Sequence, residues 1–208
     1  MIHELNNIVT EYEEIETYFK AMDITKEQRE ERETAAEDMW WVFLLLFTLI
    51  KTCIEEGNLD YGFIRDSFYE SYGDIVRKYA IADEYIETYI TRFVNTVLDT
   101  TWNNLDFANP DDNYWTSNER ALEMGLNEAN SVINYKEYKE AVKKGLKNKT
   151  WKAELDNKTR HDHSMMSGKT IGINETFKFP DCEMFFPHDE VNGTARQTVN
   201  CRCAVKYS

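Results

Sequence analysis

Four side chains in the last third of the chain are of the types that bind soft metal ions: His163, Cys182, Cys201 and Cys203. Imidazole nitrogen and thiolate sulfur are ligands that Zn²⁺ prefers, and four of them complete a tetrahedron. His161 or His188 could take the place of Cys182. The Cys-x-Cys spacing differs from the usual Cys-x₂-Cys, and the alternative is that these side chains pack and hydrogen-bond in a small core. Zinc is therefore the one candidate cofactor, and we otherwise expect none.

Nucleophilic chemistry is a second option for the same residues. A thiolate at Cys201 or Cys203 beside His163 could attack a substrate, with Asp156 or Asp162 orienting the imidazole. The sequence gives no sign of an oxyanion hole or a substrate pocket. We therefore assign no catalytic residue and expect a protein that is not an enzyme.

A structural role for the conspicuous polar residues is the third option, and the sequence favours it. Asp156 and Arg160 are four residues apart and could form a bidentate pair or brace a turn, and Arg202 could reach back similarly. Such polar contacts help to fix a small module with little apolar mass. Trp151 is the expected central anchor, packed against one or more of Phe177, Phe179 and Phe185.

The elements around these residues are expected to be short and irregular. Helical periodicity fades after Lys149, and β-like runs follow at residues 150–155, 169–173, 176–179 and 202–207. Before Lys149, helical spacing of apolar residues predicts helices at residues 2–19, 26–56, 61–72, 74–79, 82–103, 116–134 and 135–142. Capping boxes at residues 25–28 and 116–119 mark two of the helix starts.

The fold class that follows is α+β, with a mainly helical N-terminal body and a small, irregular β-containing C-terminal module. Asn109-Pro110 and the polar residues after it are the best internal break. We predict an acidic helical domain over residues 1–112 and a second domain over residues 113–208. The second domain begins with a helical lead-in to about residue 146.

Charge and apolar runs exclude several classes of protein. The net charge is −14, and residues 1–150 hold 30 acidic and 16 basic residues, so a broad DNA-binding face is not expected. A basic run at residues 136–149 leaves a local DNA contact open, although a solvated helix face explains it as well. The apolar run Met39–Ile50 is shorter than the roughly 20 residues that span a bilayer and predicts a buried helix. No signal peptide is expected, so the cysteines are not expected to form a disulfide framework, and Cys53 is assigned to the core.

Several short motifs follow one another in the terminal module. A tryptophan precedes Asp-x-x-Thr-Arg-x-x-His, and a glycine, a phenylalanine, a proline-containing loop and Asn-Cys-Arg-Cys come next. The motif positions are Trp151, Asp156, Thr159, Arg160, His163, Gly168, Asn200, Cys201, Arg202 and Cys203. In order and spacing, residues 116–205 resemble the Mu F-like phage head morphogenesis proteins. In some of these relatives a Cys-x-x-Cys stands at the arginine and histidine positions, which implies that His163 lies near the terminal cysteines.

The resemblance implies a minor head protein of a tailed bacteriophage. Such a protein is expected in the virion head, and in the host cytoplasm during assembly, with a role in head assembly, DNA packaging or DNA ejection. Its implied partners are portal or other head proteins, with the scaffold as a further candidate. An oligomer within the virion is compatible with this role, and no membrane is involved. The rival hypothesis is a zinc- or thiol-dependent enzyme, or a toxin-like module, delivered with the virion.

Overall fold

The computed structural model describes residues 2–111 and 113–208, with side chains from residue 10 onward. The chain forms two compact units, one of Met1–Thr34 with Asn127–Ser208 and the other of Ala35–Leu126. Two helices, α2 (Lys26–Glu55) and α5 (Asn118–Lys143), each contribute residues to both units. The domain boundary predicted near residue 112 concerns the order of segments along the chain, whereas these units are defined by contacts in space. That boundary stays a prediction.

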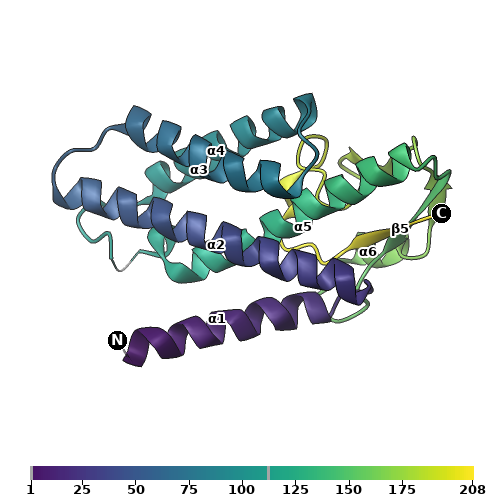
Figure 1. The fold of residues 1–208 in the computed structure, drawn as a ribbon, viewed down its shortest axis with the longest axis horizontal. Coiled ribbons are helices and arrows are strands. Elements are labelled where there is room, and N and C mark those ends of the chain that lie inside the picture. The colour runs from purple at the N-terminus through teal and green to yellow at the C-terminus, as the bar shows by residue number, and fades with distance from the viewer. Residues whose placement is uncertain (1, 112) are drawn as a thin grey trace. The chain divides into compact units, whose positions relative to one another are not determined.

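The unit formed by the two ends of the chain, hereafter the terminal unit, carries all the strands that the described residues form. It begins with α1 (Ile2–Lys20) and the first turns of α2, and it continues from the later part of α5 into the C-terminal module. That module contains β1 (Asn148–Lys152), α6 (His161–Met166), β2 (Thr170–Gly172), β3 (Phe177–Lys178), β4 (Glu183–Met184), α7 (Ala195–Thr198) and β5 (Ala204–Tyr207). Figure 1 traces this course from the purple N-terminal helix to yellow β5.

β1 is the centre of a three-stranded antiparallel sheet in the order β2-β1-β5, and β3 and β4 form a separate antiparallel pair. In β1, Lys149 and Trp151 are buried and the residues beside them are less so, which is the two-residue alternation of a half-buried strand. Val205 of β5 pairs with Trp151. The core beneath this sheet consists of Trp151, Ala153, Met166, Phe177, Phe179, Met184, Cys201, Cys203 and Val205.

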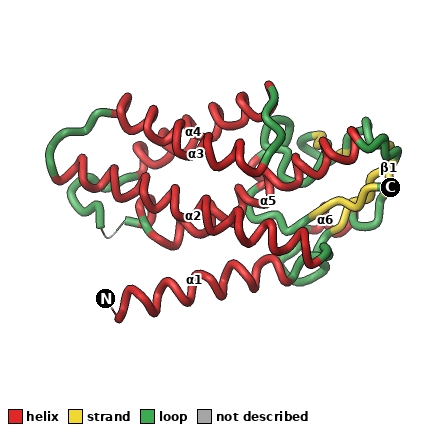
Figure 2. The backbone as a smooth tube through the Cα atoms, in the orientation of Figure 1, coloured by secondary structure: helices red, strands yellow, loops and turns green. Residues whose placement is uncertain are grey.

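The unit of residues 35–126, hereafter the helical unit, consists of the remainder of α2, then α3 (Tyr61–Tyr79), α4 (Glu84–Asn104), η1 (Tyr114–Thr116) and the start of α5. Figure 2 shows α3 and α4 lying side by side as a helical hairpin. Phe43 of α2 lies in an aromatic core, with ring centroids 6.0 Å from Phe68 and 5.8 Å from Tyr72 and from Phe93. Gly125 allows a close helix contact, because an added Cβ would lie 3.0 Å from the Ala36 carbonyl oxygen.

The predicted fold class is confirmed: helices predominate, and a few short antiparallel strands lie near the C-terminus (Figure 2). The capping box at the start of α2 is also confirmed. The Thr25 amide donates to Gln28 Oε1 at 2.9 Å, and the Gln28 amide donates to Thr25 Oγ1 at 3.2 Å. Ile15 and Phe19 of the first predicted stripe are buried, whereas its residues from Ile2 to Val9 lie outside the described side chains.

Three boundaries predicted from the sequence are wrong. Residues 61–79 form one helix, because a glycine costs only about 1 kcal/mol inside a helix and Tyr72 and Val76 on either side of Gly73 are buried. Residues 118–143 also form one helix through Asn134. The cap of that helix is Ser117, whose Oγ accepts from the Arg120 amide at 3.1 Å, and not the residue before it.

The C-terminal module departs from the predicted strands as well. It contains two short helices, α6 and α7, and a strand, β4, that the sequence pattern did not indicate. Each of these elements is six residues or shorter, so it contains too few residues for a period to be visible.

The apolar run Met39–Ile50 lies within α2 and is largely buried, as predicted, although Trp41 is 43% exposed and Leu45 is 65% exposed. Among the described helices, none combines the length and the apolar character needed to cross a membrane.

Candidate functional site

Three of the four predicted metal-binding side chains meet in the core of the terminal unit. His163 Nδ1 lies 3.4 Å from Cys201 Sγ and 3.4 Å from Cys203 Sγ, and the three atoms all lie within 4.8 Å of one another. Each of the three residues is at most 2% exposed. We call these residues the His-Cys-Cys cluster.

Two different elements bring the cluster together. His163 lies on α6, which follows β1, and the cysteines precede β5, which pairs with β1. Cys201 and Cys203 are both buried while Arg202 between them is partly exposed, as expected where alternate residues of an extended segment face the same side. Strand pairing at the end of the chain therefore places both thiols beside the imidazole.

Gln197 of α7 fixes the protonation of the His163 ring. Its amide nitrogen donates to Asp162 Oδ2 at 2.9 Å and to Asp181 Oδ1 at 2.7 Å, and carboxylates can only accept. The amide oxygen therefore faces His163 Nε2, 2.9 Å away, and that nitrogen must carry a proton. In the neutral imidazole, the remaining lone pair is then on Nδ1, which faces the two sulfurs.

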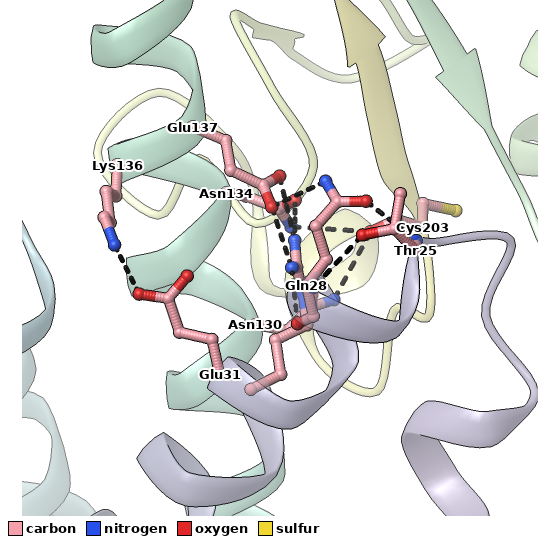
Figure 3. Close-up of polar contacts among 9 residues, drawn as sticks. Thr25, Gln28, Glu31, Asn130, Asn134, Lys136, Glu137 and Cys203 are labelled. Carbon is pink, nitrogen blue, oxygen red and sulfur yellow. Dashed lines mark hydrogen bonds and ion pairs between the residues drawn. The ribbon is translucent and has the colours of Figure 1, made fainter.

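The backbone of the Cys-Arg-Cys segment is held by amides from α5. Asn130 Nδ2 donates to the carbonyl oxygens of Cys201, at 3.1 Å, and Cys203, at 3.3 Å. Asn134 Nδ2 donates to the Cys203 carbonyl at 3.4 Å, and Tyr18 of α1 donates to the Cys201 carbonyl at 3.3 Å. Figure 3 shows Asn130 and Asn134 on α5 near Cys203.

A buried arginine of α2 orients these two asparagines. Arg32 is 0% exposed, and its Nε and Nη2 donate to the side-chain oxygens of Asn130 and Asn134, each at 3.0 Å. It also binds both carboxylate oxygens of Glu137, at 2.9 and 3.0 Å, and the Gln28 carbonyl at 3.2 Å. All five guanidinium protons are therefore engaged, and each amide is turned so that its nitrogen faces the cysteine carbonyls.

The electrostatics of the cluster separate the two cysteines. Burial raises the pKa of Cys201, but hydrogen bonds from Cys203 and His163 and the charge of His188 outweigh burial and bring that pKa well below its usual value. The hydrogen bond to Cys201 raises the pKa of Cys203 well above its usual value, and burial adds to this. Burial lowers the pKa of His163, yet its interactions with Cys201 leave the pKa raised. The pKa of Cys201 is thus lowered and that of Cys203 raised by their contact with each other.

The polar residues of the first predicted motif hold the surrounding loops. Asp156 accepts from Arg202 Nη2 at 2.6 Å, so its partner is Arg202 and not Arg160. The Arg202 guanidinium keeps the pKa of that carboxyl far below its usual range. Arg160 donates instead to the Val199 carbonyl, and Thr159 donates to the Glu154 carbonyl. These contacts connect the segment after β1 to the segment before β5.

Two other motif positions have unusual backbone geometry. Gly168 has φ +82°, and its amide donates to the Trp151 carbonyl at 2.9 Å. Asn200 has φ +55°, which asparagine tolerates better than most residues. Its backbone amide donates to Asn127 Oδ1 at 2.7 Å, and Asn127 Nδ2 donates to Asn200 Oδ1 at 3.0 Å.

Trp151 is 0% exposed and packs against the cluster. Its ring centroid lies 5.0 Å from Phe177, 5.3 Å from Phe179 and 5.7 Å from the His163 ring. Phe185, the third predicted partner, instead contacts Tyr138 at 5.8 Å.

The remaining candidate ligands lie outside the cluster. Cys182 is partly buried and packs against the apolar core without joining the three ligand atoms. His161 is exposed at the start of α6. His188 is buried and has φ +59°, and its Nε2 bonds with the Cys201 carbonyl.

The space next to the cluster is small. A cavity of about 10 Å³ borders His163 and both cysteines, together with Arg160 and Arg202. That is room for about one water molecule, whereas pockets for drug-sized ligands measure roughly 300–1,000 Å³.

Sequence reasoning missed the residues that orient the cluster, namely Arg32, Asn130, Asn134 and Gln197. Asn130 and Asn134 are four residues apart and therefore share one face of α5, which is the one periodic sign of their role. Arg32 lies far from the cysteines in sequence and looks like any charged residue of an acidic helix.

One comparison with known proteins covers the residues of the cluster. The family model described as "Phage Mu protein F like protein" matches residues 103–206, half of the chain. The NAD(+)--arginine ADP-ribosyltransferase EFV of Enterococcus faecalis is 34% identical over 91 residues, which are 42% of this chain and 18% of that protein. The chain thus spans less than a fifth of that relative's length. No solved structure matches the chain at a significant level.

Proposed function

This chain belongs to the Phage Mu protein F-like family, and we propose on that basis that it is a minor head protein of a tailed bacteriophage, with a structural role in forming the head. The family match over residues 103–206 is the observation that carries the proposal. Its place of action is then the virion head, reached from the host cytoplasm during assembly. Head assembly, DNA packaging and DNA ejection are the stages at which such a protein acts.

The geometry of the terminal unit supports a structural role for the motif residues. Asp156 and Arg160 hold loops through Arg202 and the Val199 carbonyl, and Trp151 fills the core. The cavity beside the His-Cys-Cys cluster has room for about one water molecule and none for a larger substrate. We therefore propose no enzymatic activity at the His-Cys-Cys cluster.

We propose that the helical unit provides the contacts with the portal or the head shell. Residues 35–126 contain 17 acidic and 6 basic residues, a net charge of −11, which suits a basic partner surface. Trp41 and Leu45 are exposed on α2 and lie four residues apart, so they share one face. An exposed apolar pair on an acidic surface is the kind of feature that a partner protein covers.

The test is a phage in which the gene is deleted and supplied from a plasmid. We expect the protein in purified heads by mass spectrometry, and a fall in infectious particles when the plasmid is absent. Cross-linking of intact heads should connect the helical unit to a portal or shell protein. Purified heads that lack the protein, despite its presence in the infected cell, would contradict the proposal.

A matched pair of variants separates the proposed contact surface from general effects of a new surface charge. Leu45→Glu in the helical unit should reduce incorporation into heads. Leu155→Glu, at a site 68% exposed in the terminal unit, should leave incorporation unchanged. Equal incorporation of both variants would contradict the proposal that the helical unit is the contact surface. The deletion experiment tests the role in the head separately.

The alternative is a zinc- or thiol-dependent enzyme, or a toxin-like module, carried with the virion. One observation favours the enzymatic module but not its dependence on zinc or a thiol: the similar Enterococcus protein is named as an NAD(+)--arginine ADP-ribosyltransferase. The similarity covers 18% of that protein, so the activity in its name can reside elsewhere in its chain. Incubating the purified chain with NAD⁺ and an arginine-containing acceptor tests this, and release of nicotinamide would support the alternative.

A further inference from the structure

We propose that His163, Cys201 and Cys203 bind one Zn²⁺ ion, with a solvent molecule as the fourth ligand. This inference does not depend on the proposed function. It rests on the positions of the three ligand atoms, on the hydrogen bonds that orient the imidazole and on the cavity beside the cluster.

The separations of the ligand atoms fit a tetrahedral zinc site. Zinc lies about 2.3 Å from thiolate sulfur and about 2.0–2.1 Å from imidazole nitrogen, so tetrahedral angles place sulfur and nitrogen about 3.6 Å apart and two sulfurs about 3.8 Å apart. The two distances from His163 Nδ1 to sulfur are both 3.4 Å, and all three atoms lie within 4.8 Å of one another. The two sulfur–nitrogen distances are therefore within a few tenths of an ångström of those expected around zinc.

The symmetry of the cluster favours an ion over a simple hydrogen bond. Because Nε2 donates to Gln197, Nδ1 has a single lone pair or a single proton to direct at the sulfurs. A single proton makes one strong hydrogen bond to one sulfur or a weaker bond shared between two, and both sulfurs lie at the same distance of 3.4 Å. A metal ion located between the three atoms is coordinated by both sulfurs and by the nitrogen, which is consistent with the two equal distances.

The surroundings of the cluster are those of an oriented metal site. A zinc-bound histidine usually donates its other ring nitrogen to a fixed acceptor, and here Gln197 is that acceptor and is itself held by Asp162 and Asp181. The cysteine backbone is fixed by Asn130 and Asn134, so the site is preformed. Binding would release the thiol protons, and the divalent cation would compensate the charge of the two buried thiolates that result.

The fourth position faces the small cavity beside the cluster. Its volume of about 10 Å³ suits one water molecule, and Arg160 and Arg202 are among its lining residues. Cys182 does not lie with the three ligand atoms. The structure thus assigns three protein ligands, where the sequence pattern offered four.

The experiment measures metal content in the full chain, purified without chelators from zinc-supplemented cells. We expect about one zinc per chain by elemental mass spectrometry. The variants Cys201→Ser, Cys203→Ser and His163→Ala should each lose most of that zinc. The matched controls Cys182→Ser and His161→Ala, which change the same residue types outside the cluster, should retain it. Circular dichroism reports whether each variant is folded.

A second measurement uses the wild-type chain alone, in case a ligand variant does not fold. A chelator should release the zinc and, in the same step, make two further thiols reactive towards a thiol reagent. Replacement with Co²⁺ should give a sulfur-to-metal charge-transfer band and the intense visible bands of tetrahedral cobalt. Wild-type protein with no more zinc than the Cys201→Ser/Cys203→Ser double variant would overturn the proposal, as would equal zinc loss in the Cys182→Ser control.

Discussion

Gly168 is the residue that turns the chain from α6 back towards β1. Its φ of +82° lies in the region that residues with a side chain rarely adopt, and no heavy atom outside its two chain neighbours lies within 4 Å of where a Cβ would be. A substitution there therefore changes backbone strain alone. The Gly168 amide donates a hydrogen bond to the Trp151 carbonyl, so strain caused by a substitution would arise next to the central residue of the core.

We predict that Gly168→Ala lowers the free energy of unfolding by about 1 kcal/mol, because alanine disfavours a left-handed backbone. Gly168→Asn should cost less, since asparagine tolerates that region. Urea denaturation of the three proteins measures both effects. An alanine variant as stable as the wild type would show that the turn relaxes without strain.

Lys149 is a second residue with a measurable consequence. Its side chain is 0% exposed, donates to the Phe185 carbonyl at 2.8 Å and lies over the rings of Tyr138, Phe177 and Phe185. Burial lowers the pKa of Lys149 to about 8, although Asp189 acts in the opposite direction. The charged form is therefore disfavoured in the native state.

The sign of the resulting pH dependence follows from proton binding. Between pH 8 and 10.5 the unfolded chain keeps a proton on this lysine that the native chain has lost, so native stability rises with pH in that window. We predict that the stability of wild type relative to Lys149→Met rises there by up to about 1.4 kcal/mol per pH unit and is constant below pH 8. Denaturation of both proteins across pH 7–11 checks this, and a constant difference would contradict the lowered pKa.

At the residue scale, the family resemblance implied that His163 lies near Cys201 and Cys203, but nothing in the sequence indicated which residues orient them. Histidine and cysteine have few chemical roles, so the types of His163, Cys201 and Cys203 already indicated a site. Glutamine and asparagine occur on most surfaces, and their role at Gln197 and Asn130 depends on which carboxylate or carbonyl lies opposite. That information arises only when segments distant in sequence meet.

At the scale of elements, α2 and α5 interact within the terminal unit through the buried Arg32. Its contact with Glu137 is bidentate, and the Glu137 side chain is only 14% exposed. Removing one partner of such a pair leaves the other unpaired in a poorly solvated place, which is strongly destabilising. Removing Arg32 alone should therefore cost far more stability than breaking an ion pair on the surface of the same helix.

We predict that Arg32→Met lowers the free energy of unfolding by about 3 kcal/mol. Adding Glu137→Met should cost less than the sum of the two single changes, because the unpaired carboxylate is then absent. The control is Lys26→Met, which breaks the exposed Lys26–Glu30 pair and should change stability by less than about 0.5 kcal/mol. Additive effects of Arg32→Met and Glu137→Met would contradict the coupling.

Elements were predicted from the sequence where they are long. The thirty residues of α2 show their period and their capping box, so both ends were located to within one residue. Predicted breaks at Gly73 and Asn134 were wrong, because tertiary packing outweighs a single weak helix former. Short elements such as α6 were missed because they contain too few residues to show a pattern.

At the scale of the whole molecule, charge limits the possible partners. The net charge of −14 opposes duplex DNA. In the basic run at residues 136–149, Lys136 pairs with Glu31 and Lys144 pairs with Glu140, and Lys149 is buried away from the surface. We therefore predict no salt-sensitive affinity for duplex DNA, even at about 50 mM salt. Fluorescence anisotropy with labelled duplex checks this, and binding that weakens as salt is added would contradict it.

The terminal unit is built from two separate stretches of chain, residues 1–34 and 127–208. Seen as a polymer, the 92 residues between them form a loop whose ends meet at Arg32 and the α5 asparagines. The entropy of closing a loop grows slowly, by only about 0.6 kcal/mol for each doubling of its length. A longer, shorter or different helical unit therefore adds little entropic cost to closing this loop. The helical unit can thus vary between related proteins to match different partners, while the contacts of Arg32 that close the loop stay the same.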